Sequence, residues 1–189
     1  MMDANELEFQ RIYDTFQLKI LRYLTHLAGE QEAEDLTQET FVKIHQGLEN
    51  FRGESQLSTW IYRIATNTAL DRLRSPSFQR ITDETEIADK VISTEEKKPL
   101  IEKQLIRDEM NECIRGYIEK LPESYRTVLV LSEREGLRNN EIAKILGVTL
   151  DTVKIRLHRA REILKEGLRN NCDSYWIEDN EFLPELKTL

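Results

Sequence analysis

Two short amphipathic segments separated by a glycine, within residues 139–169, restrict the fold of this chain more than any other feature. The apolar residues of the first segment share one helical side. Gly147 follows them, where a left-handed backbone reverses the chain at little cost. Thr149 is placed to cap the second segment, and Asn139 or Asn140 is placed to cap the first. The pattern predicts a helix-turn-helix.

The second of these segments is amphipathic and strongly basic. Its predicted buried stripe consists of Val153, Leu157, Ala160, Leu164 and Leu168. In this motif the second helix enters the major groove of duplex DNA, and the residues near its N-terminus lie closest to the bases. Arginine suits guanine edges, and both arginine and lysine suit phosphates. We therefore predict DNA contacts from Asn140, Thr152, Lys154, Arg156, His158, Arg159 and Arg161, and which of them meet bases stays open.

Charge is distributed unevenly along the chain. The 189 residues include 27 basic and 35 acidic side chains, a net charge of −8, which excludes a protein that coats nucleic acid through bulk positive charge. Residues 110–171 nevertheless carry 12 basic and 9 acidic side chains, a net charge of +3. Such asymmetry favours contact between this one segment and nucleic acid.

The rest of the chain predicts an all-α fold. Apolar residues at helical spacing predict a long helix that ends at Gly29 and a second helix that follows it. A third helix is predicted after a loop, with Ser58 or Thr59 as its cap, and it stops at Pro76. The low content of glycine and proline, 7 and 4 residues, agrees with short connections between helices.

Composition divides the chain into four parts. We expect two small helical domains, at residues 1–75 and 110–171, joined by an acidic, flexible linker at residues 76–109. An acidic tail follows at residues 172–189, and its paired aromatic residues favour docking on the protein over fraying.

Five stretches of the sequence resemble sigma factors of the sigma-70 family. Residues 121–129, 140–148 and 152–161 resemble region four, and residues 33–41 and 51–67 resemble region two. Only a short linker separates the two regions, with no room for a region-three domain. This layout is similar to that of the extracytoplasmic-function (ECF) group. The family pattern has a small polar residue where this chain has Ile155, which implies a different promoter preference.

The resemblance implies a subunit that binds core RNA polymerase and directs initiation at specific promoters. Region four would bind the minus-thirty-five element as duplex DNA. Region two would bind the minus-ten element and hold its non-template strand after melting. Most members of this group are held inactive by an anti-sigma factor, so such a partner is implied here too.

Residues 52–58 would form the pocket for a flipped minus-ten base. Gly53 permits close approach of the backbone, and the side chains of Ser55, Gln56 and Ser58 offer hydrogen bonds to a base edge. Stacking is expected from Tyr62 and from Trp60, although an ordinary core position for Trp60 is equally compatible with the sequence. The candidate minus-ten contacts are Arg52, Ser55, Gln56, Ser58, Trp60, Arg63, Asn67, Arg72 and Arg74.

The second predicted helix is, by the same resemblance, the binding site for the clamp of core polymerase. Its candidate residues are Asp35, Leu36, Gln38, Glu39 and Phe41. We expect Phe41 to be part of the core, and Asp35, Gln38 and Glu39 to be contact residues.

Other classes of function find little support. A helix-turn-helix regulator, or a sigma-like decoy, that acts without polymerase remains the alternative. The three histidines are scattered, so we predict no catalytic site, metal or cofactor. Cys113 and Cys172 have no CxxC spacing, and Cys113 is expected to be buried. With no signal sequence and no apolar stretch of membrane-spanning length, a soluble cytoplasmic protein without membrane insertion is expected.

Overall fold

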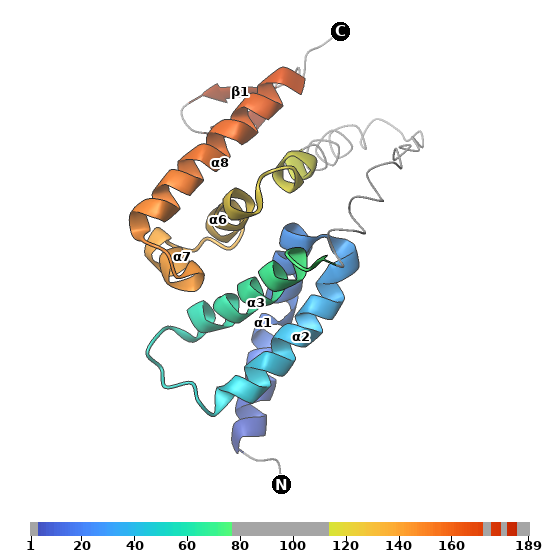
Figure 1. Cartoon of the computed structure of the whole chain (residues 1–189), viewed down its shortest axis with the longest axis vertical. Helices are drawn as coiled ribbons and strands as arrows, with labels where there is room; N and C mark the ends of the chain where they lie inside the picture. The colour runs from blue at the N-terminus through green and yellow to red at the C-terminus, as the bar shows by residue number, and fades with distance from the viewer. Residues whose placement is uncertain (1–3, 77–113, 172–174, 179–180, 185–189) are drawn as a thin grey trace.

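The computed structural model describes residues 4–76, 114–171, 175–178 and 181–184, which are mostly helical (Figure 1). The N-terminal bundle consists of α1 (Ala4–Ala28), α2 (Glu30–Leu48) and α3 (Leu57–Leu73). The C-terminal bundle consists of a helical segment at residues 114–119, α6 (Glu123–Glu133), α7 (Asn139–Leu146) and α8 (Leu150–Asn171). The predicted all-α fold is confirmed for both bundles.

A short hairpin follows α8 and was not predicted. Strands β1 (Tyr175–Glu178) and β2 (Glu181–Pro184) pair antiparallel, with Tyr175 opposite Pro184. The docking of the tail on the protein stays a prediction, because the side chains of residues 172–189 lie outside the described part of the structure. Residues 77–109 of the predicted linker, Cys113 and Cys172 also lie outside the described residues.

The start of α3 differs from the prediction. The helix begins at Leu57 with Gln56 as its N-cap, so Ser58 and Thr59 lie inside the first turn and the prediction of either as cap is wrong. Starting at Leu57 lets that side chain pack against the core, where Thr59 is also buried. The earlier start therefore adds buried area to the N-terminal bundle.

The predicted caps of the helix-turn-helix are half right. Thr149 caps α8 as predicted, since its Oγ1 accepts a hydrogen bond from the Thr152 backbone N–H at 3.2 Å. The prediction of Asn139 or Asn140 as the cap of α7 is wrong, because the N-cap is Arg138. The Glu141 carboxylate accepts a hydrogen bond from the Arg138 backbone N–H at 2.8 Å and so supplies the cap from within the helix.

One apolar cluster runs through both bundles. Buried side chains of α3, among them Ile61 and Ala65, belong to the same cluster as Val128 of α6 and Ile142 of α7. In Figure 1, α7 lies beside α3 and α6 lies beside α1. The two bundles are therefore packed against each other through a shared core.

Candidate nucleic-acid interface

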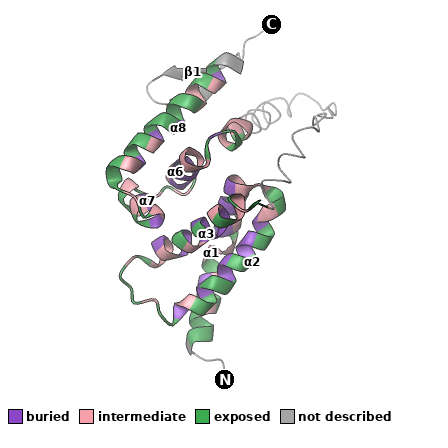
Figure 2. Ribbon diagram, in the orientation of Figure 1, coloured by how far each residue is buried: buried purple, intermediate pink, exposed green. Residues whose placement is uncertain are grey.

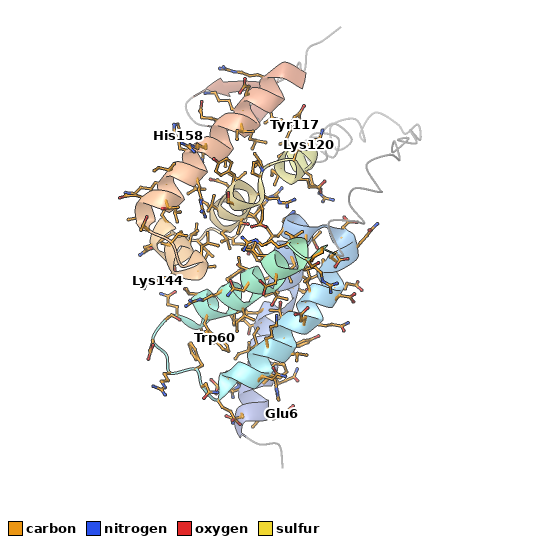
Figure 3. All side chains as sticks on the ribbon, in the orientation of Figure 1. Glu6, Trp60, Tyr117, Lys120, Lys144 and His158 are labelled. Carbon is orange, nitrogen blue, oxygen red and sulfur yellow. The ribbon has the colours of Figure 1, made fainter. Side chains whose placement is uncertain are left out.

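The basic helix α8 has one buried side and one exposed side. Val153, Leu157, Ala160 and Leu168 are buried and Leu164 is partly buried, as the sequence predicts. Exposed residues recur along the rest of the helix (Figure 2), and His158 lies on the side facing away from α6 (Figure 3). Of the predicted DNA contacts on α8, Lys154, His158, Arg159 and Arg161 are exposed, and Thr152 and Arg156 are half-buried.

The turn before α8 holds this side in place. Gly147 has φ +64° and ψ +32°, the left-handed conformation that other residues adopt only at a cost of about 1–2 kcal/mol. The Val148 backbone N–H then donates a hydrogen bond to the Ala143 carbonyl at 3.1 Å. Val153 is fully buried below this turn, and Asn140 is exposed in the first turn of α7. The predicted helix-turn-helix is confirmed.

The basic side chains of α8 differ in how far they are already engaged. Arg161 donates two hydrogen bonds to Glu133 of α6, at 2.5 and 3.2 Å, so its role here is to join α6 and α8. Arg159 contacts the Tyr125 hydroxyl at 3.3 Å, and Lys154 lies 3.8 Å from Asp151. Among the described residues, Arg156 forms no ion pair or side-chain hydrogen bond, and the same holds for His158.

The loop that leads into α3 carries the predicted minus-ten residues. Gly53 has φ +70°, Arg52 and Gln56 are exposed, and Ser55 and Ser58 are half-buried. This arrangement presents one cation and several hydrogen-bonding side chains on an open loop, which suits contact with a single strand.

The two aromatic residues at the start of α3 take different positions. Trp60 is half-buried, with its ring 4.9 Å from that of Phe51 and against Gly47 of α2. Figure 3 shows it between α3 and the preceding loop. Tyr62 is buried, and its hydroxyl donates a hydrogen bond to Glu135. Stacking of a base on Tyr62 is therefore wrong for this arrangement, because its ring lies inside the shared core.

Of the four remaining minus-ten candidates, all on α3 or at its C-cap, two are engaged within the protein. Arg63 and Asn67 are exposed, and no partner of theirs lies among the described residues. Arg72 lies 3.5 Å from Glu32 of α2. Arg74 donates hydrogen bonds to both carboxylate oxygens of Glu123, at 2.6 and 3.2 Å, and so links the N-terminal bundle to α6.

The predicted polymerase-binding helix divides into a buried and an exposed side. Leu36 and Phe41 are buried, which bears out the expectation for Phe41. For Leu36 the prediction of a direct contact is wrong, because its side chain fills the core below the surface. Asp35, Gln38 and Glu39 are exposed, and Glu39 pairs with Lys43 at 2.8 Å.

Sequence reasoning did not single out one further exposed residue on this side of α2. Val42 is 55% exposed and follows Asp35, Gln38 and Glu39 at the spacing i, i+3, i+4 and i+7, so the four share one side of α2. We call these four residues the α2 surface patch. The available signal was that Val42 falls outside the apolar stripe of its helix. Val42 thus adds an apolar group to a side of α2 that otherwise presents polar and acidic side chains.

Glu135 joins the two bundles through a side-chain hydrogen bond. Its carboxylate, just after α6, accepts the hydrogen bond from Tyr62 of α3. Burial raises the pKa of Glu135 above its ordinary value, while the Tyr62 hydrogen bond and the positive charges of Lys19 and Arg134 partly offset that rise. Arg22 acts in the same direction as these two cations, and nearby Tyr23 has a raised pKa through burial. The packed form therefore binds a proton at Glu135 more tightly than a solvated carboxyl does.

This raised pKa gives the packing a dependence on pH. The packed form favours the protonated carboxyl of Glu135. The stability that this protonation contributes is therefore present at low pH and is lost as pH rises through the raised pKa of Glu135. Glu135→Gln keeps an oxygen acceptor for Tyr62 and removes the ionisation. We expect this variant to unfold at a higher temperature than the wild type at pH 7, with the difference shrinking toward pH 4.5.

Differential scanning fluorimetry between pH 4.5 and 8 checks this prediction. Glu162→Gln is the control, because Glu162 is an exposed carboxyl on α8 without an ion pair among the described residues. A Glu135→Gln curve that runs parallel to the wild-type curve, as the control should, would show that Glu135 does not titrate differently in the packed form.

The described part of the chain contains neither a membrane-spanning helix nor a cluster of metal-ligating side chains. None of its helices combines the length and apolar composition needed to cross a membrane. No group of three or more histidine, cysteine, aspartate or glutamate side chains within that part is arranged to hold a metal ion.

Known proteins match both halves of the chain. The family model for sigma-70 region 2 matches residues 12–78, and the model for sigma-70 region 4 matches residues 111–164. The chain is 36% identical to the RNA polymerase sigma-H factor of Pseudomonas aeruginosa, over 82% of this chain and 86% of that protein. It is also 36% identical to the ECF RNA polymerase sigma factor SigW of Bacillus subtilis, over 86% and 89% of the two chains.

Solved structures share the fold. The sigma factor RpoE from Bartonella quintana, solved with the anti-sigma factor NepR, matches with a TM-score of 0.65 at 20% identity, over 87% of this chain and 98% of that one. CnrH, solved with the cytosolic domain of CnrY, matches with a TM-score of 0.63 at 21% identity, over 89% and 92%. With two family models matched in order and this identity to sigma factors across most of its length, the chain belongs to the ECF group of the sigma-70 family.

Proposed function

We propose that this protein binds core RNA polymerase and directs initiation at specific promoters. In this proposal α8 binds the minus-thirty-five element as duplex, and the loop at residues 52–58 with the exposed side of α3 binds the minus-ten element. The observation that carries it is the joint presence of a region-two match and a helix-turn-helix whose basic side is open to solvent. A helix-turn-helix regulator that acts without polymerase would not require the part of the chain that matches region two.

The division of the chain follows from the same proposal. Residues 1–75 act as the polymerase- and minus-ten-binding domain and residues 110–171 as the minus-thirty-five-binding domain. Residues 76–109 act as linker and residues 172–189 as an additional tail. Because the family comprises initiation factors rather than enzymes, we propose that the chain has no catalytic activity and works in the cytoplasm, where polymerase and promoters are.

The net charge of −8 supports a protein that acts on DNA within a larger complex. Acidic surroundings oppose the approach of the isolated protein to the phosphate backbone, while the +3 charge of residues 110–171 still favours contact once polymerase positions that domain. Tight promoter binding by the isolated protein at physiological salt would contradict this part of the proposal.

The packed bundles must separate on the promoter. Elements named minus-ten and minus-thirty-five lie about 25 base pairs apart, or ~85 Å of duplex at about 3.4 Å per base pair. The helices that carry the two candidate surfaces belong to bundles in direct contact, and α8 itself is only ~33 Å long at 1.5 Å per residue. Fluorophores at Gln46 and Lys165, in a chain with both cysteines replaced by serine, should move apart when the promoter complex forms. Unchanged energy transfer between them would contradict the separation.

An anti-sigma factor is the further partner that we propose. The structural neighbour from Bartonella quintana was solved with such a protein, and the shared fold supports a similar partner here. A regulator that stabilises contact between the bundles would keep the two DNA-binding surfaces from reaching their separate elements.

Run-off transcription with core polymerase of the same source, on fragmented genomic DNA, tests the proposed function. The protein should co-elute with core on gel filtration and should produce discrete transcripts that core alone does not make. Failure to bind core would exclude the sigma function. Core binding without new transcripts would contradict the proposed role in promoter-directed initiation.

A further inference from the structure

Ile155 occupies a position on α8 that the fold does not explain. Its side chain is 53% exposed and lies outside the buried stripe, whose residues Val153 and Leu157 are two positions before and after it. A β-branched residue at an exposed helix position also has a lower helix propensity than alanine, lysine or glutamate. Neither packing nor helix propensity accounts for isoleucine at this position.

The neighbours of Ile155 on the helix surface are the proposed DNA contacts. Residues three and four positions away share a helical side, which places Thr152 one turn before Ile155 and His158 and Arg159 one turn after it. Ile155 lies within the first two turns of α8, the part of a recognition helix that approaches base edges. It is thus an apolar side chain surrounded by polar and cationic groups on the side that faces the groove.

The major groove offers one kind of apolar group to such a side chain. Three of the four bases present only hydrogen-bond donors and acceptors there, while thymine also presents its C5 methyl group. An isoleucine among base edges would leave donors and acceptors without partners at any other base. At thymine, contact between the isoleucine side chain and the C5 methyl removes water from both apolar surfaces. The stiff χ1 of a β-branched residue lowers the entropy lost in this contact.

We propose that Ile155 is a specificity-determining residue that packs against the C5 methyl of a thymine in the minus-thirty-five element. This inference rests on the proposed function and deepens it, since it assigns a base preference to one residue of α8. Arg156 and Lys154 beside it supply charge and hydrogen bonds, and Ile155 supplies the apolar contact.

A methyl scan of the promoter tests the proposal with the complete holoenzyme. In a promoter identified by run-off transcription, each thymine of the minus-thirty-five element is replaced in turn by deoxyuridine, which removes only the C5 methyl. One replacement should weaken binding of the wild-type holoenzyme about fourfold, equivalent to about 0.8 kcal/mol at 1.4 kcal/mol per tenfold. Holoenzyme with Ile155→Ala should bind the two forms of that site equally well, whereas Ile155→Val should keep most of the difference.

Ile163→Ala is the matched control, because Ile163 is also exposed on α8, at 43%, but lies two turns further from the N-terminus. This variant should show the same methyl effect as the wild type. The proposal is overturned by a scan without a sensitive thymine, by a minus-thirty-five element that contains none, or by a sensitive thymine that stays sensitive in Ile155→Ala. In each of these cases the wild-type holoenzyme still initiates at the promoter, so the proposed function stands. Loss of promoter-specific transcripts in the wild type is a failure of that function instead.

Discussion

Asp35→Lys is expected to weaken the binding of the protein to core RNA polymerase about 30-fold or more. Asp35 is exposed on the α2 surface patch and forms no ion pair among the described residues, so its carboxylate is available to a basic partner. Truncating one member of a buried charge pair at an interface costs roughly 2–5 kcal/mol, and reversal adds repulsion. Each 1.4 kcal/mol is a tenfold change in affinity. Fluorescence anisotropy of the labelled protein, titrated with core polymerase, measures the effect.

Position 35 is a better test than position 39. Glu39 pairs with Lys43, and the Lys43 ammonium also donates a hydrogen bond to Thr68 of α3 at 3.1 Å. Reversing Glu39 would disturb the packing of α2 on α3 as well as any contact with polymerase. Asp35→Lys changes a single solvated group, so thermal unfolding should be nearly that of the wild type while affinity falls.

Glu8→Lys provides the matched control, since it makes the same change in net charge at an exposed position on α1. Its affinity for core should stay within about twofold of the wild type. Equal losses in both variants would mean that only total charge matters, and unchanged affinity in Asp35→Lys would remove the α2 surface patch from the polymerase interface. Val42→Ala adds a second probe, which should weaken binding through lost apolar contact while leaving every charge in place.

The helices and the turn between α7 and α8 could be predicted because their signals are local. Gly147 and Thr149 act within one turn of where they stand, and the stripe of α8 follows from its own spacing. The caps of α3 and α7 were wrong for a physical reason. The N-caps are Gln56 and Arg138, which are not residue types favoured at this position, and each lacks a side-chain cap hydrogen bond. Packing decides where α3 begins, and the hydrogen bond to Glu141 decides where α7 begins.

The partners of the site residues could not be predicted, because they come from distant parts of the sequence. Nothing near Tyr62 indicates that its hydroxyl donates a hydrogen bond to Glu135, or that Arg74 pairs with Glu123 of the other bundle. A tyrosine expected to stack on a base is thus a buried contact between bundles. The hairpin after α8 could have been predicted, because short apolar runs at residues 175–177 and 182–183 flank polar residues. The acidic charge and the aromatic residues of the tail instead favoured the prediction of a docked tail.

These distant contacts connect the two proposed DNA surfaces. Arg74, a candidate for the minus-ten strand, is held by Glu123, so binding of that strand and packing of the bundles compete for the same guanidinium. Promoter DNA would thus favour the separated form, while a regulator that holds the packed form would withhold Arg74 from DNA.

Arg156→Ala is expected to reduce promoter-specific initiation by roughly 5- to 150-fold while leaving core binding intact. Arg156 lies in the second turn of α8, and no ion pair or side-chain hydrogen bond holds it among the described residues. Its guanidinium can therefore contact a base edge without giving up an internal partner. A bidentate contact between arginine and guanine is worth about 1–3 kcal/mol of discrimination. Single-round transcription from the native promoter and from promoters with one base pair changed in the minus-thirty-five element measures the effect.

Alanine variants of two other arginines of α8 are the controls for the loss of positive charge and for the loss of an internal ion pair. Arg169 is exposed in the last turn, so Arg169→Ala removes the same charge far from the N-terminal end and should change initiation by less than about twofold. Arg161→Ala breaks the pair with Glu133, and its main effect should be a small loss of stability, because exposed pairs contribute about 0–1 kcal/mol.

The pattern of losses identifies what Arg156 contacts. If it reads a base, Arg156→Ala lowers activity on the native promoter and relaxes the preference at one position of the element. If it binds a phosphate, the loss is the same for every promoter and the slope of affinity against salt concentration falls by about one. Simultaneous loss of core binding would contradict the assignment of Arg156 to the DNA interface alone, because Arg156 is half-buried on α8 and the α2 surface patch belongs to the other bundle.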